Sequence, residues 1–232
     1  MEKKNILGIC IFAGLLSIAI ALPTAVRNFT DSSRNVTVKG LCEREVEADR
    51  AIWPIVYKEG GNSVSALAAT VAEKNKTIVE WLRAAGLSDE EIDVSAPKIE
   101  NLAANGYAEH RSYDYVMTSV ITVCTNKVRF VVDLQKKQFD LLGKGIAIGS
   151  GNSWDYPVSY DYTSLNSIKA EMIEQAILNA REAADKFAKD SGSRIGRIRN
   201  ATQGQFSILD RDANTPYIKT VRVVSTVNYS LR

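Results

Sequence analysis

The sequence predicts an α+β protein, with antiparallel sheets covered on one side by helices and an N-terminal signal or anchor helix in front of them. Two stretches, residues 64–82 and 168–188, repeat apolar residues every three or four positions, as amphipathic helices do. The final stretch, residues 217–231, alternates apolar and polar residues, which is typical of an antiparallel strand with one buried face. The other extended segments come in pairs between helices, which gives the order ββαββαββαββ.

The first 23 residues have the features of an export signal. Two lysines precede an uncharged run over residues 6–22, and a proline follows it. As a helix, this run would span about 25 Å, slightly less than the roughly 30 Å of a bilayer core. Cleavage after Ala21 would remove residues 1–23 almost completely, and retention as a signal anchor is the alternative. We therefore expect the protein in the periplasm or at the periplasmic face of the inner membrane.

The composition is that of a folded globular protein. Of 232 residues, 45% are apolar and 24% are charged, so the roughly 210 exported residues can bury a sizeable core as one domain or two packed halves. The formal net charge is only +2, and no run of lysines or arginines occurs. Nucleic acid is therefore not an expected partner, because a binder would carry a strongly basic face. We expect a linker over residues 24–34 and a folded domain over residues 35–232.

The first folded elements should be two strands that form a hairpin. Residues 35–46 alternate, and one parity carries Val36, Val38, Gly40 and Cys42. The second strand covers residues 51–58. Because Pro54 has no amide hydrogen, this strand should lie at a sheet edge or contain a bulge. Two glycines then end the hairpin.

A helix is predicted between the N-cap Ser63 and the stop signal Gly86. Its apolar stripe comprises Val64, Leu67, Ala68, Val71, Asn75, Ile78, Val79 and Leu82. After a turn over residues 89–93, residues 94–103 and 115–125 form two further extended segments, separated by an Asn-Gly turn signal.

A shorter helix is predicted over residues 130–142, with core candidates Val131, Leu134, Phe139 and Leu142. A short strand over residues 146–148 follows among several glycines. These glycines do not have Gly-x-Gly-x-x-Gly or Walker spacing, so we expect no phosphate-binding loop.

The longest helix covers residues 164–189. Its buried stripe comprises Ile168, Met172, Ala176, Ala180, Ala184 and either Phe187 or Ala188. The alanines should let the helix approach a sheet or another helix closely. Residues 195–208 are extended, and a polar turn over residues 210–214 leads to the last strand. Its buried parity carries Tyr217, Val221, Val223, Val227, Tyr229 and Leu231.

Several motifs along the chain resemble those of the SIMPL-domain family. The first strand reads Val36-Thr37-Val38-Lys39-Gly40, with Glu45 and Asp49 after it. The first helix ends in Leu82-Arg83-Ala84-Ala85-Gly86-Leu87, with Ile92 and Val94 after it. The long helix carries Ala176, Ala180, Arg181, Ala184 and Ala188, and its exit reads Gly192-Ser193-x-Ile195-Gly196. The resemblance covers residues 35–232.

This resemblance implies a bacterial envelope or periplasmic protein of α+β fold, of the type labelled oxidative-stress defence protein or periplasmic immunogen. It also implies that some relatives assemble into ring-like oligomers, and it supplies no catalytic residues. The exported part has two cysteines and few methionines, so any protection from oxidants should be indirect.

The segment over residues 149–163 is richer in aromatic residues than the resemblance leads us to expect. Its candidate site residues share one parity: Trp154, Tyr156, Tyr160 and Tyr162. In a strand, all four rings would project from one face. They would either pack beneath the long helix or form an exposed platform for a subunit or a ligand, because Tyr and Trp are enriched at such contacts.

We predict no catalytic or metal-binding constellation. The single histidine, His110, lies in a polar run typical of a solvated loop. The acidic residues at 89–91 and at Asp210 and Asp212 lack the calcium-loop pattern and suit a helix-initiating turn and a hairpin tip. Cys42 and Cys124 are interpreted as small buried side chains, and a disulfide between them is the alternative.

We therefore expect a non-enzymatic cell-envelope protein, without metal or cofactor, that acts through self-association or partner binding. Its expected partners are further copies of itself, other envelope proteins, and the membrane if the N-terminal segment is retained. The alternative is a periplasmic protein that binds a small ligand or peptide on the aromatic surface.

Overall fold

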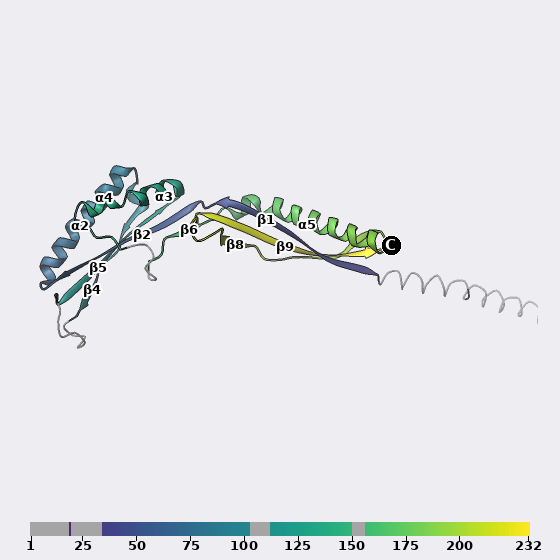
Figure 1. The fold of residues 1–232 in the computed structure, drawn as a ribbon, viewed down its shortest axis with the longest axis horizontal. Coiled ribbons are helices and arrows are strands. Elements are labelled where there is room, and N and C mark those ends of the chain that lie inside the picture. Colours follow the sequence, from purple (N-terminus) through teal and green to yellow (C-terminus); the bar gives the residue numbers. More distant parts are fainter. Residues whose placement is uncertain (1–18, 20–33, 103–111, 150–155) are drawn as a thin grey trace, which may run out of the picture. The chain divides into compact units, whose positions relative to one another are not determined.

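The computed structural model describes residue 19 and residues 34–102, 112–149 and 156–232 (Figure 1). From residue 34 onward, these residues divide into two compact units. Unit 1 contains residues 34–44, 166–207 and 221–232, and unit 2 contains the other described residues. Both units combine strands with helices, and the registered strand pairs are antiparallel, so the predicted α+β class is confirmed.

The predicted N-terminal helix over residues 1–23 lies outside the described residues, apart from Ala19. In the part of the chain that the structure describes, no helix is both long enough and apolar enough to cross a bilayer.

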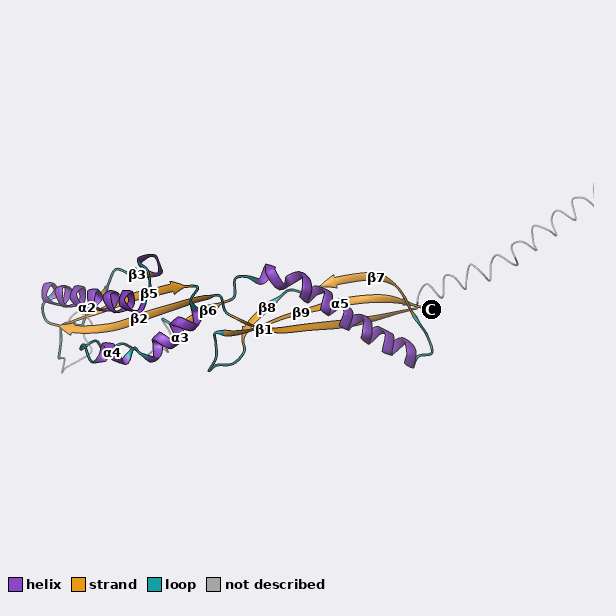
Figure 2. Ribbon diagram, turned by 90° about the horizontal axis from the view of Figure 1, so that it is seen from above, coloured by secondary structure: helices purple, strands orange, loops and turns teal. Residues whose placement is uncertain are grey.

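Unit 1 contains most of one sheet and the long helix that lies against it (Figures 1 and 2). The strand order is β1 (Asn35–Glu47), β9 (Ile218–Leu231) and β7 (Ile195–Gln203), and β8 (Ser207–Asp210) also pairs with β9. The helix is α5 (Leu165–Asp190). Every second residue of β9 from position 219 to position 229 is buried, which confirms the predicted alternation.

The predicted stripe of α5 is buried at Met172, Ala176, Ala180, Ala184 and Ala188. Its last position is Ala188, because Phe187 is 62% exposed. A Cβ atom on Gly40 of β1 would lie 1.8 Å from the carbonyl oxygen of Ala176 and 2.5 Å from the amide nitrogen of Ala180. The alanines and Gly40 therefore bring the helix backbone directly against the strand, the close approach that the alanines predict.

Unit 2 is built on a long antiparallel pair. β2 (Arg50–Gly61) pairs with β5 (Tyr115–Thr125) from Ala51 opposite Thr125 to Gly61 opposite Tyr115. β3 (Ile92–Val94) and β4 (Lys98–Asn101) pair with β5, and β6 (Ser159–Asp161) pairs with the start of β2. Pro54 lies beyond β6, where β2 has a neighbouring strand on one side in the described residues, as its missing amide hydrogen requires.

Helices cover one face of this sheet: α2 (Val64–Ala85), α3 (Val128–Lys136) and the short α4 (Phe139–Leu142) (Figure 1). The odd-numbered residues of β2 and β5 face the helices and form the core, with Trp53, Ile55, Tyr57, Ile121 and Val123 almost fully buried. The predicted caps of α2 are confirmed, because Ser63 accepts a hydrogen bond from the amide of Ala66 and Gly86 has a φ of 112°. The even-numbered residues form the opposite face, here called the open face.

The predicted hairpin of the first two strands is wrong, because β1 and β2 belong to different sheets. At the junction, the amide of Ala48 donates to the carbonyl of Tyr217 at 2.8 Å, and the amide of Asp49 donates to the carbonyl of Asp161 at 2.9 Å. These two hydrogen bonds satisfy the amides of Ala48 and Asp49 with distant segments, so the chain does not turn back onto β1. The chain therefore passes from one sheet to the next.

The predicted helix over residues 130–142 is two helices, α3 and α4, with a break around Lys137 and Gln138. Val131 and Leu134 are buried as predicted, but Phe139 is 70% exposed and Leu142 is 47% exposed. Because the break shifts the helical phase, Leu141 takes the buried position instead. The predicted strand over residues 146–148 is reduced to a single bridge between Ile148 and Tyr57.

Candidate functional site

Among the described candidate aromatic residues, Tyr156 and Tyr160 lie on opposite faces of the sheet. Trp154 lies outside the described residues. β6 is only three residues long, so Tyr156 precedes it and Tyr162 follows it, and both side chains are half-buried. Tyr156 borders a hollow on the open face, together with Ile52 and Thr122.

Tyr160 faces the other side of the sheet and is only 5% exposed. Its ring meets the ring of Tyr217 edge-on, with centroids 6.0 Å apart, and its hydroxyl donates to Gln135 of α3 at 3.0 Å. Burial raises the pKa of its hydroxyl. Tyr160 is therefore a core residue, as the packing alternative expected, although α3 is the helix it contacts.

The acidic turn at residues 89–91 is a structural anchor. The Glu91 carboxylate accepts hydrogen bonds from the amide of Ser88 at 2.8 Å, from the hydroxyl of Thr125 and from the ammonium of Lys127 at 3.0 Å. The Ser88 amide and then Thr125 contribute most to lowering the pKa of Glu91 from 4.5 to about 2. This carboxylate fixes the 3-10 helix η1 (Asp89–Glu91) to the end of β5, as the helix-initiating interpretation suggested.

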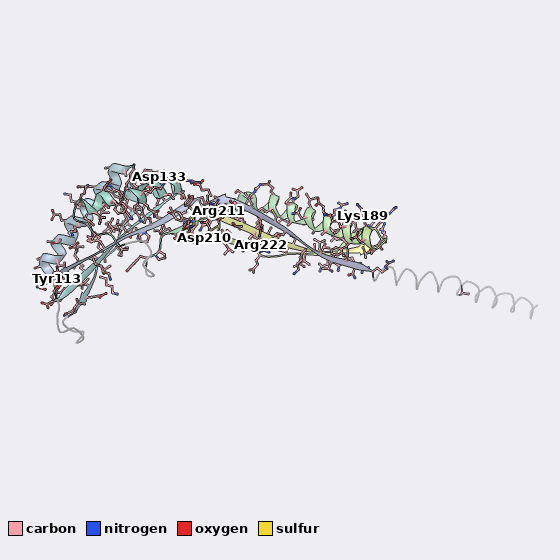
Figure 3. The ribbon with its side chains drawn as sticks, viewed as in Figure 1. Tyr113, Asp133, Lys189, Asp210, Arg211 and Arg222 are labelled. Atoms are coloured by element: carbon pink, nitrogen blue, oxygen red, sulfur yellow. The ribbon has the colours of Figure 1, made fainter. Side chains whose placement is uncertain are left out.

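Asp210 and Asp212 lie at the turn between β8 and β9, where Figure 3 labels Asp210 and Arg211. Asp212 accepts hydrogen bonds from the hydroxyl of Thr215, from Arg211 at 3.0 Å and from the amides of Asn214 and Thr215 at 2.8 Å each. Thr215 and Arg211 lower the pKa of Asp212 to about 2. The hairpin-tip interpretation is confirmed, since these contacts close a turn.

The remaining chemical candidates are the single histidine and the two cysteines of the predicted domain. His110 lies outside the described residues. Cys42 is half-buried and Cys124 is exposed, and both are free thiols, so the predicted burial of Cys124 is wrong. It is exposed because it lies opposite Ile52, on the open face of the sheet. Among the described residues, no group of three His, Cys, Asp or Glu side chains is arranged to hold a metal ion.

The backbone edge of β1 is one of the two outer edges in the strand order β1-β9-β7. In the described residues, β1 has β9 on one side and no strand on the other. The amide of Leu231 on β9 donates to the carbonyl of Arg34 at 3.0 Å, which indicates that even-numbered residues of β1 point their backbone groups toward β9. The odd-numbered residues Thr37, Lys39, Leu41 and Glu43 then point theirs outward, and we call this row the β1 edge.

One contact supports this direction. The side-chain amide of Asn179 on α5 donates to the carbonyl of Leu41 at 2.8 Å. Asn179 also belongs to a shallow hollow of about 320 Å³ on α5, which includes Ala183 and the exposed ring of Phe187. The β1 edge is thus flanked by a helix surface that carries an exposed apolar ring.

Sequence reasoning missed Asn179 as a strand-edge contact, because nothing in its spacing distinguishes it from other polar positions of an amphipathic helix. It also gave no role to Asp49, which the fold explains. The Asp49 carboxylate accepts from the amide and hydroxyl of Thr163 and from the amide of Ser164, at 2.7–2.9 Å. Burial would raise the pKa of Asp49, but these hydrogen bonds outweigh it and lower that pKa below 3.8.

With the geometry described, comparison with known proteins identifies the family. Residues 36–229 match the family described as SIMPL, protein of unknown function (DUF541). This match covers most of the chain, so the chain belongs to the SIMPL family, and the resemblance of its motifs is confirmed. No curated protein matches the chain in sequence.

Proposed function

We propose that this protein is exported to the cell envelope and acts there by self-association, without catalysing a reaction. The observation that carries the proposal is the β1 edge, because no strand lies beside this row in the described part of the chain. An exposed strand edge is a template for pairing with another chain. The backbone hydrogen bonds supply affinity, and neighbouring side chains supply specificity.

The side chains near the β1 edge suit a second protein chain better than solvent. Leu41 is 39% exposed and Phe187 is 62% exposed. Strand addition would cover both apolar groups and would pair outward backbone groups of β1 other than the carbonyl of Leu41, which Asn179 already binds. If β1 pairs with β1 of a second copy, the interface is self-complementary and closes as a dimer. If it pairs with β7, the interface is head-to-tail and gives a ring or a filament.

Export is supported by residues 1–23, in which two lysines precede an apolar run and a small-residue cleavage site. Retention of this segment would hold the assembly at the periplasmic face of the inner membrane. Family membership adds no activity to this proposal, since the family is described as being of unknown function. We include in the same proposal an indirect role of this protein in oxidative-stress defence.

Substitution within the β1 edge tests the proposal. Lys39→Pro removes an outward amide hydrogen and leaves the side facing β9 intact, as edge strands tolerate. Lys39→Gln is the matched control, because it removes the same charge and keeps the amide hydrogen. We expect light scattering to show oligomers for the wild type and Lys39→Gln and mainly monomers for Lys39→Pro, with unchanged circular dichroism.

An unchanged oligomer mass for Lys39→Pro would show that β1 is not the interface. If that variant does not fold, Thr37→Pro makes the same test two residues earlier on the β1 edge. A wild type that stays monomeric at high concentration would overturn the proposal itself.

A further inference from the structure

The open face of unit 2 contains a hollow of about 340 Å³ that the proposed self-association does not use. Its apolar lining includes Ile52 and Val120, from the even-numbered positions of β2 and β5. The lining also includes Lys98 and four residues that carry hydroxyl groups, Ser95, Thr118, Thr122 and Tyr156. We call this site the open-face hollow.

The charged group in the lining of the open-face hollow favours an anionic ligand. Among the described residues that line the hollow, Lys98 is the only charged one, and none carries a carboxylate. The ammonium of Lys98 forms an ion pair with Glu100 at 3.9 Å, and the two side chains are 74% and 45% exposed. Such an exposed pair is weak, so it leaves the ammonium of Lys98 available to an anion. Asp93 and Lys58 lie on the same face, opposite Thr122 and Thr118, outside the lining.

The volume and the apolar lining of the hollow favour a small ligand with a hydrocarbon part. Ligand pockets range over about 300–1,000 Å³, so this hollow suits a small molecule. Such pockets combine mostly apolar walls with a few placed polar groups that fix the orientation of the ligand. Here the aliphatic side chains would contact a hydrocarbon chain, and Lys98 with the hydroxyl groups would bind one oxyanion.

We infer that the open-face hollow binds a small amphipathic monoanion, namely a carboxylate with a short aliphatic chain. Lys98 holds the carboxylate, Tyr156 and Thr122 donate further hydrogen bonds, and Ile52 and Val120 pack against the chain. Tyr156 is thus the member of the predicted aromatic set that contacts ligand, on the face opposite to Tyr160. This inference does not depend on assembly at the β1 edge, which belongs to unit 1.

Octanoate is the probe, titrated into the full-length protein and followed by calorimetry and by amide shifts in NMR spectra. Lys98→Gln should weaken octanoate binding about tenfold or more, because it removes a charge-assisted hydrogen bond. Lys58→Gln is the matched control, since it removes the same charge from the same face beyond the lining, and it should leave the affinity unchanged. Octanol should bind at least about tenfold more weakly than octanoate.

Val120→Trp offers a second variant, because its ring should fill the hollow and abolish binding while circular dichroism reports the fold. The inference is overturned by any of three results: no saturable octanoate binding to the wild type, equal affinities of the wild type and Lys98→Gln, or octanol that binds as tightly as octanoate.

Discussion

Glu91 is the last residue of η1, and its carboxylate accepts hydrogen bonds from Ser88, Thr125 and Lys127. Its pKa falls from 4.5 to about 2, so the folded state favours the charged form. The stability that it contributes is complete above about pH 4.5 and is lost as the pH falls toward about 2. We predict that Glu91→Gln lowers the free energy of unfolding by about 1–3 kcal/mol at neutral pH.

Urea denaturation at several pH values measures this effect. The difference between the wild type and Glu91→Gln should shrink as the pH falls below about 4.5. Glu90→Gln is the control, because Glu90 is an exposed neighbour in the same turn, and it should behave like the wild type. A difference that stays constant down to about pH 2 would contradict the assigned role of the Glu91 carboxylate.

Gly40 decides how closely α5 approaches β1. An added Cβ atom would lie 1.8 Å from a carbonyl oxygen of the helix, which is backbone and cannot rotate away. We predict that Gly40→Ala destabilises the protein by about 3 kcal/mol or more, as overpacking of a core does at its upper range. Thermal unfolding checks this value.

Gly61→Ala is the matched control, since its Cβ atom would lie 3.5 Å from Leu67, at ordinary contact distance. It should be neutral or slightly stabilising, because it restricts the unfolded chain. Equal losses of stability for the two variants would mean that the approach of α5 is not limited at Gly40.

Individual residues were predictable where a local pattern defines them. Ser63 and Gly86 carry the signals of a helix start and stop, and the chain uses them in that way. Glu91 and Thr125, which are in contact, are separated by 34 positions in the sequence. Asp49 and Thr163 are separated by 114 positions. No spacing in a single sequence encodes such contacts, because the fold alone brings these residues together.

At the scale of elements, the aromatic segment around β6 makes the clearest prediction. Tyr160 is buried against Tyr217 and α3, whereas Tyr156 lies half-buried on the open face. We expect Tyr160→Ala to lower the free energy of unfolding by about 3–5 kcal/mol, as removal of a buried ring does. Tyr156→Ala should cost less than about 1 kcal/mol.

Chemical denaturation of the two variants provides the comparison. If Tyr156→Ala lowers the free energy of unfolding as much as Tyr160→Ala, the two rings share one buried environment. The assignment of Tyr156 and Tyr160 to opposite faces of the sheet would then be wrong.

The helices and the long strands could be predicted because their periodicity extends over ten or more residues. The four-residue repeat of alanines in α5 and the alternation in β9 are examples. Pairing of strands could not be predicted in the same way. β1 and β2 are neighbours in sequence and belong to different sheets, since Ala48 and Asp49 bond to segments more than a hundred residues further along the chain.

For the protein as a whole, we propose export to the cell envelope and assembly of its α+β domain through strand edges. The export part predicts that the protein isolated from cells is found in the periplasmic or inner-membrane fraction. The mature N-terminus, determined by mass spectrometry, should begin at Leu22 if the signal is cleaved and at Met1 if it is retained as an anchor. An intact chain found only in the cytosol would contradict export.

The central claim is that this protein works by contact between copies of itself at the β1 edge. Sedimentation equilibrium of the full-length protein over a wide range of concentrations tests this claim most directly. We predict a mass of at least two chains of 25.5 kDa, which decreases on dilution and which Lys39→Pro reduces to that of a single chain. A single-chain mass for the wild type at every concentration would contradict it.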